Sequence, residues 1–221
     1  MSVKDNLERL RAEIPQHVKL ICVSKFHEPD TVMEAYDAGE RHFGESRVQE
    51  LVDKQPHLPE DVQWHFIGHL QRNKIKYMID FVDMIHGVDS LRLLNAIERQ
   101  ATNAERDVAC LLQVHIADEE SKFGFSPEEL KALLASPEFK ALERVKIAGL
   151  MGMATFTDDR EQVRDEFQSL KKLFEEVKAE FFADSEEFKE LSMGMSGDYD
   201  IAIEEGSTMV RIGTAIFGER G

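Results

Sequence analysis

The stretch FKELSMGMSGDYDIAIEEGSTMVRIGTAIFG, residues 188–218, holds the pattern that decides the fold. Residues 188–195 are predicted to form a strand, residues 198–204 a helix and residues 208–218 a second strand, because two apolar runs flank a short helical segment. Strand, helix and strand in this order make the βαβ unit, in which the two strands are parallel.

The same alternation extends over the rest of the chain. The first strand is predicted over residues 17–24, where the continuous apolar run Leu20–Val23 is typical of a strand buried on both faces of a parallel sheet. Further strands are predicted over residues 41–45, 63–68, 81–88, 107–116 and 145–153. Alternating strands and helices predict an α/β protein, and the total of eight strands favours a closed (β/α)8 barrel of the TIM type over an open doubly wound sheet.

Helices are predicted between these strands. They cover residues 1–15, a segment that starts at Pro29 and ends just before Gly39, the segment up to about Lys54, residues 71–79, a segment capped by Ser90 that runs to about Asn103, and a segment that begins at the capping box of Ser126 and Glu129. The clearest helix carries an apolar stripe formed by Val163, Phe167, Leu170, Phe174, Val177 and Phe181. This spacing indicates an amphipathic helix that packs on a sheet.

The chain is predicted to form a single domain over residues 1–221, because no Pro-, Gly- or Ser-rich linker interrupts the alternation. Few residues follow the predicted eighth strand, so a full eighth helix cannot fit there. The N-terminal helix is therefore expected to pack on the outer ring of the barrel and fill that gap.

Composition excludes several classes of function. Among 221 residues there are 27 Lys and Arg and 43 Asp and Glu, a formal net charge of −16, which argues against a nucleic-acid groove and against anionic membranes. Charges interrupt the N-terminus, so no signal peptide is predicted, and no apolar run is long enough to span a membrane. Cys22 and Cys110 lie in apolar runs and are expected to be buried free thiols. A cytoplasmic protein is expected.

Lys25 is the most informative single residue. It directly follows the first strand, at the end of a barrel where functional residues gather. A partly desolvated lysine amine there can attack a carbonyl as a Schiff-base nucleophile, although a lone lysine at a strand end is more often simply solvated.

The loops after the last two strands strengthen the case. Ser196 and Gly197 follow the seventh strand, and Gly213 and Thr214 lie near the end of the eighth. Glycines let backbone N–H groups approach an anion, and barrels often bind phosphate at these two loops, whereas ordinary tight turns would carry the same residues. A phosphate site facing a Schiff-base lysine indicates a phosphorylated aldehyde or ketone, either pyridoxal 5′-phosphate (PLP) or a sugar phosphate handled by an aldolase.

Arg211 and two histidines bear on that choice. Arg211 can face the pyridine nitrogen of a cofactor, or it can pair with a carboxylate inside the barrel. His65 and His69 lie four residues apart, which raises the question of zinc. No third ligand has convincing spacing, so no metal is predicted, and the histidines are expected to be hydrogen-bonded polar residues at the barrel mouth.

Several motifs resemble those of one family. WHFIGHLQRNK (64–74), EESKFGF (119–125), GLMGMAT (149–155) and LSMGMSGDYDIAIEEGSTMVRIGTAIFG (191–218) are similar to stretches of the pyridoxal phosphate homeostasis protein family, YggS/PROSC. The resemblance implies one PLP-binding barrel like the N-terminal domain of alanine racemases, which is PLP fold type III.

The resemblance also implies roles for single residues. Lys25 matches the lysine that forms the internal aldimine, and Arg211 matches the arginine that faces the pyridine nitrogen. Ser46 stands where many members carry Asn, and its hydroxyl can still bond the cofactor. The residues predicted to bind PLP are Lys25, Ser46, His65, Met193, Ser196, Gly197, Arg211, Gly213 and Thr214.

Members of this family are thought to hold or deliver PLP without conventional turnover. Racemisation needs an acid–base group on each face of the substrate, and of Tyr36, Tyr77 and Tyr199 the last follows the phosphate loop and is the candidate to test. The predicted function is PLP homeostasis by a monomer, with apo PLP-dependent enzymes as recipients. A PLP-dependent racemase or lyase is the alternative, and an aldolase without PLP a weaker one. Lys122 is interpreted as a solvated loop lysine, with a secondary role in PLP transfer as the alternative.

Overall fold

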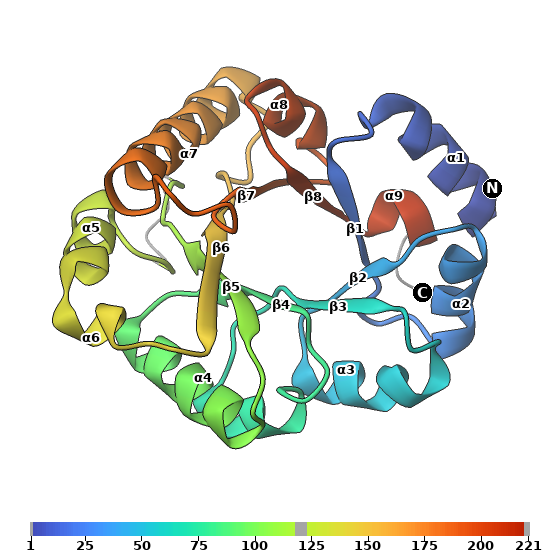
Figure 1. Ribbon diagram of the computed structural model, residues 1–221. Helices are drawn as coiled ribbons and strands as arrows, with labels where there is room; N and C mark the ends of the chain where they lie inside the picture. The colour runs from blue at the N-terminus through green and yellow to red at the C-terminus, as the bar shows by residue number, and fades with distance from the viewer. Residues whose placement is uncertain (1, 118–122, 219–221) are drawn as a thin grey trace.

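The computed structural model describes residues 2–117 and 123–218, and in this part of the chain eight parallel strands close into a barrel (Figure 1). Each strand pairs with the next, and β8 pairs with β1, so the prediction of a closed (β/α)8 barrel is confirmed. The strands are β1 (Lys19–Val23), β2 (His42–Glu45), β3 (Gln63–Phe66), β4 (Met84–Val88), β5 (Val108–Gln113), β6 (Val145–Met151), β7 (Glu190–Met195) and β8 (Met209–Ile212).

Helices form a ring outside the strands (Figure 1). They are α1 (Val3–Glu13), α2 (Pro29–Asp37), α3 (Val48–Lys54), α4 (Leu91–Asn103), α5 (Pro127–Ala135), α6 (Pro137–Lys140), α7 (Arg160–Phe181), α8 (Tyr199–Glu204) and α9 (Thr214–Phe217), with short 3₁₀ helices η1 (Gln55–His57) and η2 (Arg72–Tyr77). Helix α1 packs against α2 and α9, which confirms that the N-terminal helix belongs to the outer ring.

The boundaries of several elements differ from the predictions. The segment predicted as a helix over residues 71–79 forms only the 3₁₀ helix η2, and the fourth strand begins at Met84 instead of residue 81. The eighth strand ends at Ile212, because the chain turns at Gly213 into the short helix α9. The apolar residues of α9 were predicted as part of the strand, because a short apolar run does not distinguish a strand from a buried helix.

The apolar core has two layers. Residues that face outward from the strands pack against the helices, and the buried face of α7 carries the predicted stripe from Val163 to Val177. Inside the barrel a smaller cluster contains Ile21, Leu111 and Met209. Because successive side chains of a strand point to opposite faces, each strand contributes to both layers.

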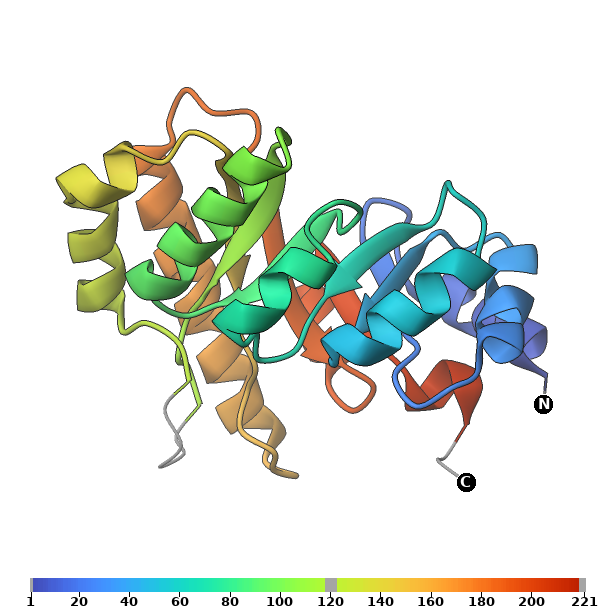
Figure 2. The same cartoon turned by 90° about the horizontal axis from the view of Figure 1, so that it is seen from below.

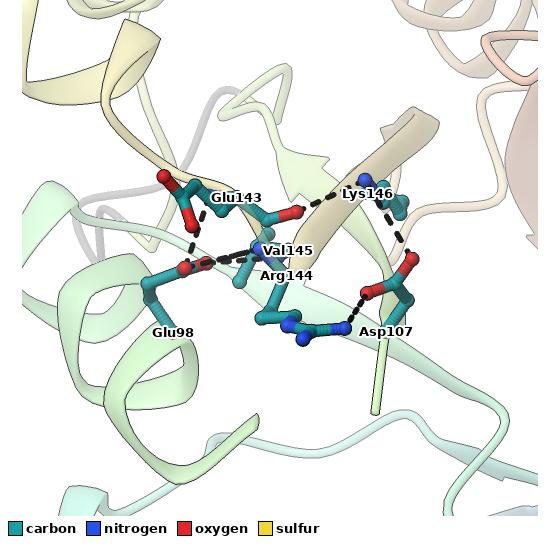
Figure 3. A network of polar contacts seen from close by, with 6 residues as sticks. All are labelled: Glu98, Asp107, Glu143, Arg144, Val145 and Lys146. Carbon is teal, nitrogen blue, oxygen red and sulfur yellow. Dashed lines mark hydrogen bonds and ion pairs between the residues drawn. The ribbon is translucent and has the colours of Figure 1, made fainter. Parts of the chain in front are cut away.

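A polar network anchors helix α4 to the start of β6 (Figure 3). The Glu98 carboxylate accepts the backbone N–H groups of Glu143, Arg144 and Val145 at 2.8–3.0 Å. Asp107, just before β5, pairs with Arg144 at 3.2 Å. This network lies where β5 and β6 begin, and the loop between β6 and α7 lies on the opposite side, together with α9 (Figure 2).

The described residues contain no helix long and apolar enough to cross a membrane. Cys22 and Cys110 are both buried free thiols, as predicted.

Candidate functional site

A cavity of about 800 Å³ opens where the strands end. Most of the residues predicted to bind the cofactor line it together, namely Lys25, Ser46, Ser196, Gly197, Arg211, Gly213 and Thr214. They come from the ends of β1, β2, β7 and β8, which are neighbours in the closed sheet. Barrel closure therefore brings residues from the two ends of the chain to one site.

Helix α3 holds the turn that carries Lys25 on both sides. The Lys54 ammonium donates to the carbonyl oxygen of Ser24 at 2.7 Å, and the backbone N–H of Phe26 donates to Glu50 at 2.7 Å. Phe26 has φ of 69°, in the left-handed region that a non-glycine residue adopts at a cost of about 1–3 kcal/mol. These contacts fix the peptides before and after Lys25, so its side chain starts from a defined position.

A buried carboxylate stands behind this turn. Glu45 accepts hydrogen bonds from the Ser24 hydroxyl and from Lys54, each at 2.7 Å, through the same oxygen. Burial raises the pKa of Glu45, and the Lys54 ammonium opposes that rise. The second oxygen of Glu45 has no hydrogen-bond partner among the described residues. Lys54 is thus the main electrostatic support of this carboxylate.

Arg211 points into the barrel and is one of the residues that line the cavity. Its Nη1 donates to the hydroxyl of Ser192 at 2.6 Å and its Nη2 to the carbonyl oxygen of Gly152 at 3.1 Å. No carboxylate of the described residues forms an ion pair with it, and Asp198 attracts it only from a distance. Burial lowers the pKa of Arg211 to about 10, so the guanidinium remains charged at neutral pH. A guanidinium has five N–H donors, and those not used here can meet a lone pair of a ligand in the cavity.

The loops after β7 and β8 form a cradle of donors. The Ser196 hydroxyl accepts the N–H of Gly213 at 3.4 Å, which ties the two loops together. A Cβ on Gly197 would meet nothing within 4 Å, so this side of the cradle is open. A Cβ on Gly213 would lie 3.0 Å from the carbonyl oxygen of Val23, so glycine permits the close approach of the two strands. With the hydroxyl of Thr214, this arrangement is suited to a phosphate or a similar anion.

Two predicted site residues do not line the cavity in the described structure. Met193 is fully buried between the barrel and the helices, because it alternates with the inward-facing Ser192 on β7. His65 lies inside the barrel below the cavity and bonds two other histidines. His69 is mostly exposed, with Nδ1 3.6 Å from Asp89, so the two histidines considered for zinc do not meet. The described residues include no group of three or more His, Cys, Asp or Glu side chains that could hold a metal ion.

The tyrosine singled out for testing lies elsewhere. The Tyr199 hydroxyl donates to Glu13 of helix α1 at 2.5 Å, and burial together with this bond raises the pKa of Tyr199 to about 12. Tyr36 donates to Asp61, and Tyr77 packs under two lysines. None of the three tyrosines is among the described residues that line the cavity. Lys122 lies outside the described residues.

Some lining residues were not predicted as binding residues. The cavity also contacts Gln113 on β5 and a group of apolar side chains, Phe123, Met151, Met153, Phe156 and Met195. Gln113 is the polar residue at the end of an otherwise apolar strand, and this position could have identified it from the sequence as a site residue. The apolar residues gave no such signal, because in the sequence they resemble ordinary core residues.

Comparison with known proteins shows the class to which this barrel belongs. The sequence model of the family "Alanine racemase, N-terminal domain" matches residues 1–221, and the chain belongs to this family. The alanine racemase of Clostridium difficile has a TM-score of 0.77 at 15% identity, over 99% of this chain and 56% of that chain, which is a likeness of fold alone.

Within that class, the chain belongs to the pyridoxal phosphate homeostasis proteins. The protein of this name from Aquifex aeolicus is 42% identical over 206 residues, which cover 91% of this chain and 87% of the relative. That of Vibrio alginolyticus is 36% identical over 234 residues, covering 99% and 98%. PipY of Synechococcus elongatus, solved with PLP bound, has a TM-score of 0.89 and 37% identity, over 98% of this chain and 100% of that chain.

Proposed function

We propose that this protein binds PLP in the barrel-end cavity and holds it for PLP homeostasis. The observation that carries the proposal is the buried, positively charged Arg211 with no carboxylate partner in the described structure, which lines the same cavity as Lys25 and the donor cradle of the last two loops. A pyridine nitrogen offers a lone pair without a negative charge, which is the kind of acceptor that the unused guanidinium donors need.

The residues of the cavity fit the remaining groups of PLP. Ser196, Gly197, Gly213 and Thr214 would hold the phosphate through hydroxyl and backbone donors. Lys25 would hold the aldehyde covalently as a Schiff base, in which its amine nitrogen bonds the aldehyde carbon and the carbonyl oxygen leaves as water. Ser46 lines the same cavity, and its hydroxyl would donate to a polar group of the ring.

Arg211 also supports storage over turnover. Bound PLP supplies an electrophilic aldehyde and an electron-withdrawing ring. A guanidinium that stays charged disfavours a proton on the ring nitrogen, which weakens electron withdrawal from any attached amino acid. Racemisation would in addition need a second acid–base group, and the Tyr199 hydroxyl is occupied by Glu13 at the outer ring.

The proposal extends to the way the protein works. It acts as a cytoplasmic monomer that passes PLP to apo PLP-dependent enzymes. Light scattering after size exclusion tests the monomer, and reactivation of an apo-transaminase by the PLP-loaded protein tests the delivery. A stable dimer, or reactivation no faster than by free PLP at the same concentration, would contradict these parts of the proposal.

Titration with PLP, followed by visible absorption, tests the binding site. The wild-type protein is expected to bind PLP with a yellow band, Lys25→Ala to lose the band, and Arg211→Leu to bind at least about tenfold more weakly, since hydrogen bonds to charged groups contribute about 1.5–3 kcal/mol. A band in Lys25→Ala identical to that of the wild type would refute Lys25 as the anchor. A panel of amino acids in the same cuvette then tests turnover, and steady consumption of one of them would favour the enzyme alternative.

A further inference from the structure

A line of polar side chains runs through the interior of the barrel and ends at Arg211. Four strands supply it, with His42 on β2, His65 on β3, His86 on β4 and Ser192 on β7. Nδ1 of His42 lies 3.0 Å from Nε2 of His65, and Nδ1 of His65 lies 2.9 Å from Nε2 of His86. Nδ1 of His86 lies 3.0 Å from the hydroxyl of Ser192, which accepts from Arg211 at 2.6 Å. We name these four residues the histidine chain.

The histidine chain is buried where it approaches Arg211. His65 is 3% exposed, and His86 and Ser192 are each 0% exposed. Buried polar groups must find their partners inside the protein, so each contact along the histidine chain needs one donor and one acceptor. This requirement allows the positions of the protons to be derived.

Arg211 sets the direction of every hydrogen bond in the chain. A guanidinium only donates, so the Ser192 oxygen accepts from it, and the Ser192 proton must go to its other partner, Nδ1 of His86. His86 then carries its proton on Nε2 and donates to Nδ1 of His65. By the same step His65 carries its proton on Nε2 and donates to Nδ1 of His42. Each histidine that donates along the chain is therefore a neutral Nε2–H tautomer.

An extra proton on the chain would place two donors face to face. Burial and the positive charge of neighbouring groups act in the same sense, since they lower the pKa of His65 to about 3 and that of His86 well below its usual value. The hydrogen bond from the Ser192 hydroxyl to His86 consequently cannot reverse its direction, and the Ser192 oxygen continues to accept from Arg211. Gly152 supplies the other acceptor that the described structure gives this guanidinium.

We propose that His65, His86 and Ser192 are positioning residues, which hold the Arg211 guanidinium in one orientation toward the cavity and so define the surroundings of the ring nitrogen of PLP. The link to the ring nitrogen rests on the proposed function. The direction of the hydrogen bonds does not, because it follows from atoms of this chain alone.

The first test measures the tautomers in the protein without PLP. Long-range ¹H–¹⁵N spectra of histidine-labelled protein at neutral pH distinguish Nδ1–H, Nε2–H and doubly protonated rings, and His65→Gln and His86→Gln assign the signals. We expect both His65 and His86 as Nε2–H tautomers. An Nδ1–H tautomer or a charged ring at either position would overturn the derived direction, whatever PLP does.

The second test removes the last hydroxyl of the chain. Ser192→Ala should weaken PLP binding at least about tenfold and shift the maximum of the visible band, because Arg211 loses one of its two acceptors. Ser192→Thr, which keeps a hydroxyl, should restore the wild-type band position.

Ser207→Ala is the matched control. The Ser207 hydroxyl is also buried and donates to a backbone carbonyl oxygen, that of Met193 being nearest at 2.8 Å, and it forms no hydrogen bond with Arg211 in the described structure. Its loss should lower the melting temperature without moving the band. Equal affinity and band position in Ser192→Ala and Ser207→Ala would reduce the chain to a structural role and overturn the proposal. If the wild-type protein binds no PLP, the proposed function fails, while the tautomer measurement still decides the direction of the chain.

Discussion

Removal of the Lys54 ammonium probes the support of the Lys25 turn most sharply. The Lys54 and Glu45 side chains are 6% and 0% exposed, and their charged atoms lie 2.7 Å apart. In Lys54→Met the buried carboxylate would keep one donor, the Ser24 hydroxyl, because its second oxygen already lacks a partner in the described structure. Breaking a buried ion pair on one side costs about 3–5 kcal/mol, so we expect a loss of this size in the free energy of unfolding at pH 8.

The pH dependence gives the same variant a second readout. Burial already raises the pKa of Glu45, and without Lys54 that pKa rises further. A carboxyl whose pKa is higher in the folded than in the unfolded state stabilises the fold at low pH, and this stabilisation is lost as the pH rises through the folded-state value. The deficit of Lys54→Met relative to the wild type should therefore be smaller at pH 5 than at pH 8.

The double variant Glu45→Leu/Lys54→Met separates stability from binding. Replacing both charges with apolar groups removes the unpaired buried carboxylate, so most of the lost stability should return. PLP affinity should be lower than in the wild type in both the single and the double variant, because in both the carbonyl oxygen of Ser24 lacks the Lys54 donor that holds the turn. Denaturant unfolding at both pH values and PLP titration measure the two quantities. A loss below about 1 kcal/mol in Lys54→Met, or no recovery in the double variant, would refute the reasoning.

Three further variants test other parts of the account. Gly194→Ala should lower stability by more than about 2 kcal/mol, because φ is 94° there and a Cβ would lie 2.6 Å from that of Ala202. Gly197→Ala should unfold like the wild type within about 0.5 kcal/mol, because its Cβ would meet nothing within 4 Å. Denaturant unfolding of both glycine variants measures these losses, and a larger loss in Gly197→Ala than in Gly194→Ala would contradict the prediction. Tyr199→Phe should lose about 1 kcal/mol of stability with its bond to Glu13 and leave PLP affinity unchanged, and a weakened visible band would place Tyr199 at the site after all.

The sequence carried enough information to predict the barrel. Continuous apolar strands and the stripe on α7 are properties of local composition, and parallel strands buried on both faces leave few other arrangements. Lys25 and the two terminal loops could be placed at one site because parallel strands all end at the same side of a barrel. Met193 was assigned to that site without regard to its side-chain direction, and the alternation along β7 turns it outward.

Interactions that depend on closure had no signal in the sequence. His42, His65 and His86 stand on separate strands, and each looks like an ordinary polar residue until the barrel places them in one line. Lys54 lies in a helix and looks like a solvent-facing residue, yet it is buried because the end of α3 brings its ammonium to Glu45 on β2 and to the carbonyl oxygen of Ser24. Charged residues are rarely buried, so a pattern-based prediction favours exposure for this lysine.

Borohydride reduction of the PLP-loaded protein, followed by peptide mapping, tests the central claim most directly. Reduction converts a Schiff base into a stable secondary amine and marks the lysine that formed it. We expect the label on the peptide containing Lys25, at about one PLP per chain, and no label on Lys25→Ala. A label that stays after this substitution, or that lies on a lysine outside the cavity, would contradict the assignment of Lys25 as the residue that holds the cofactor.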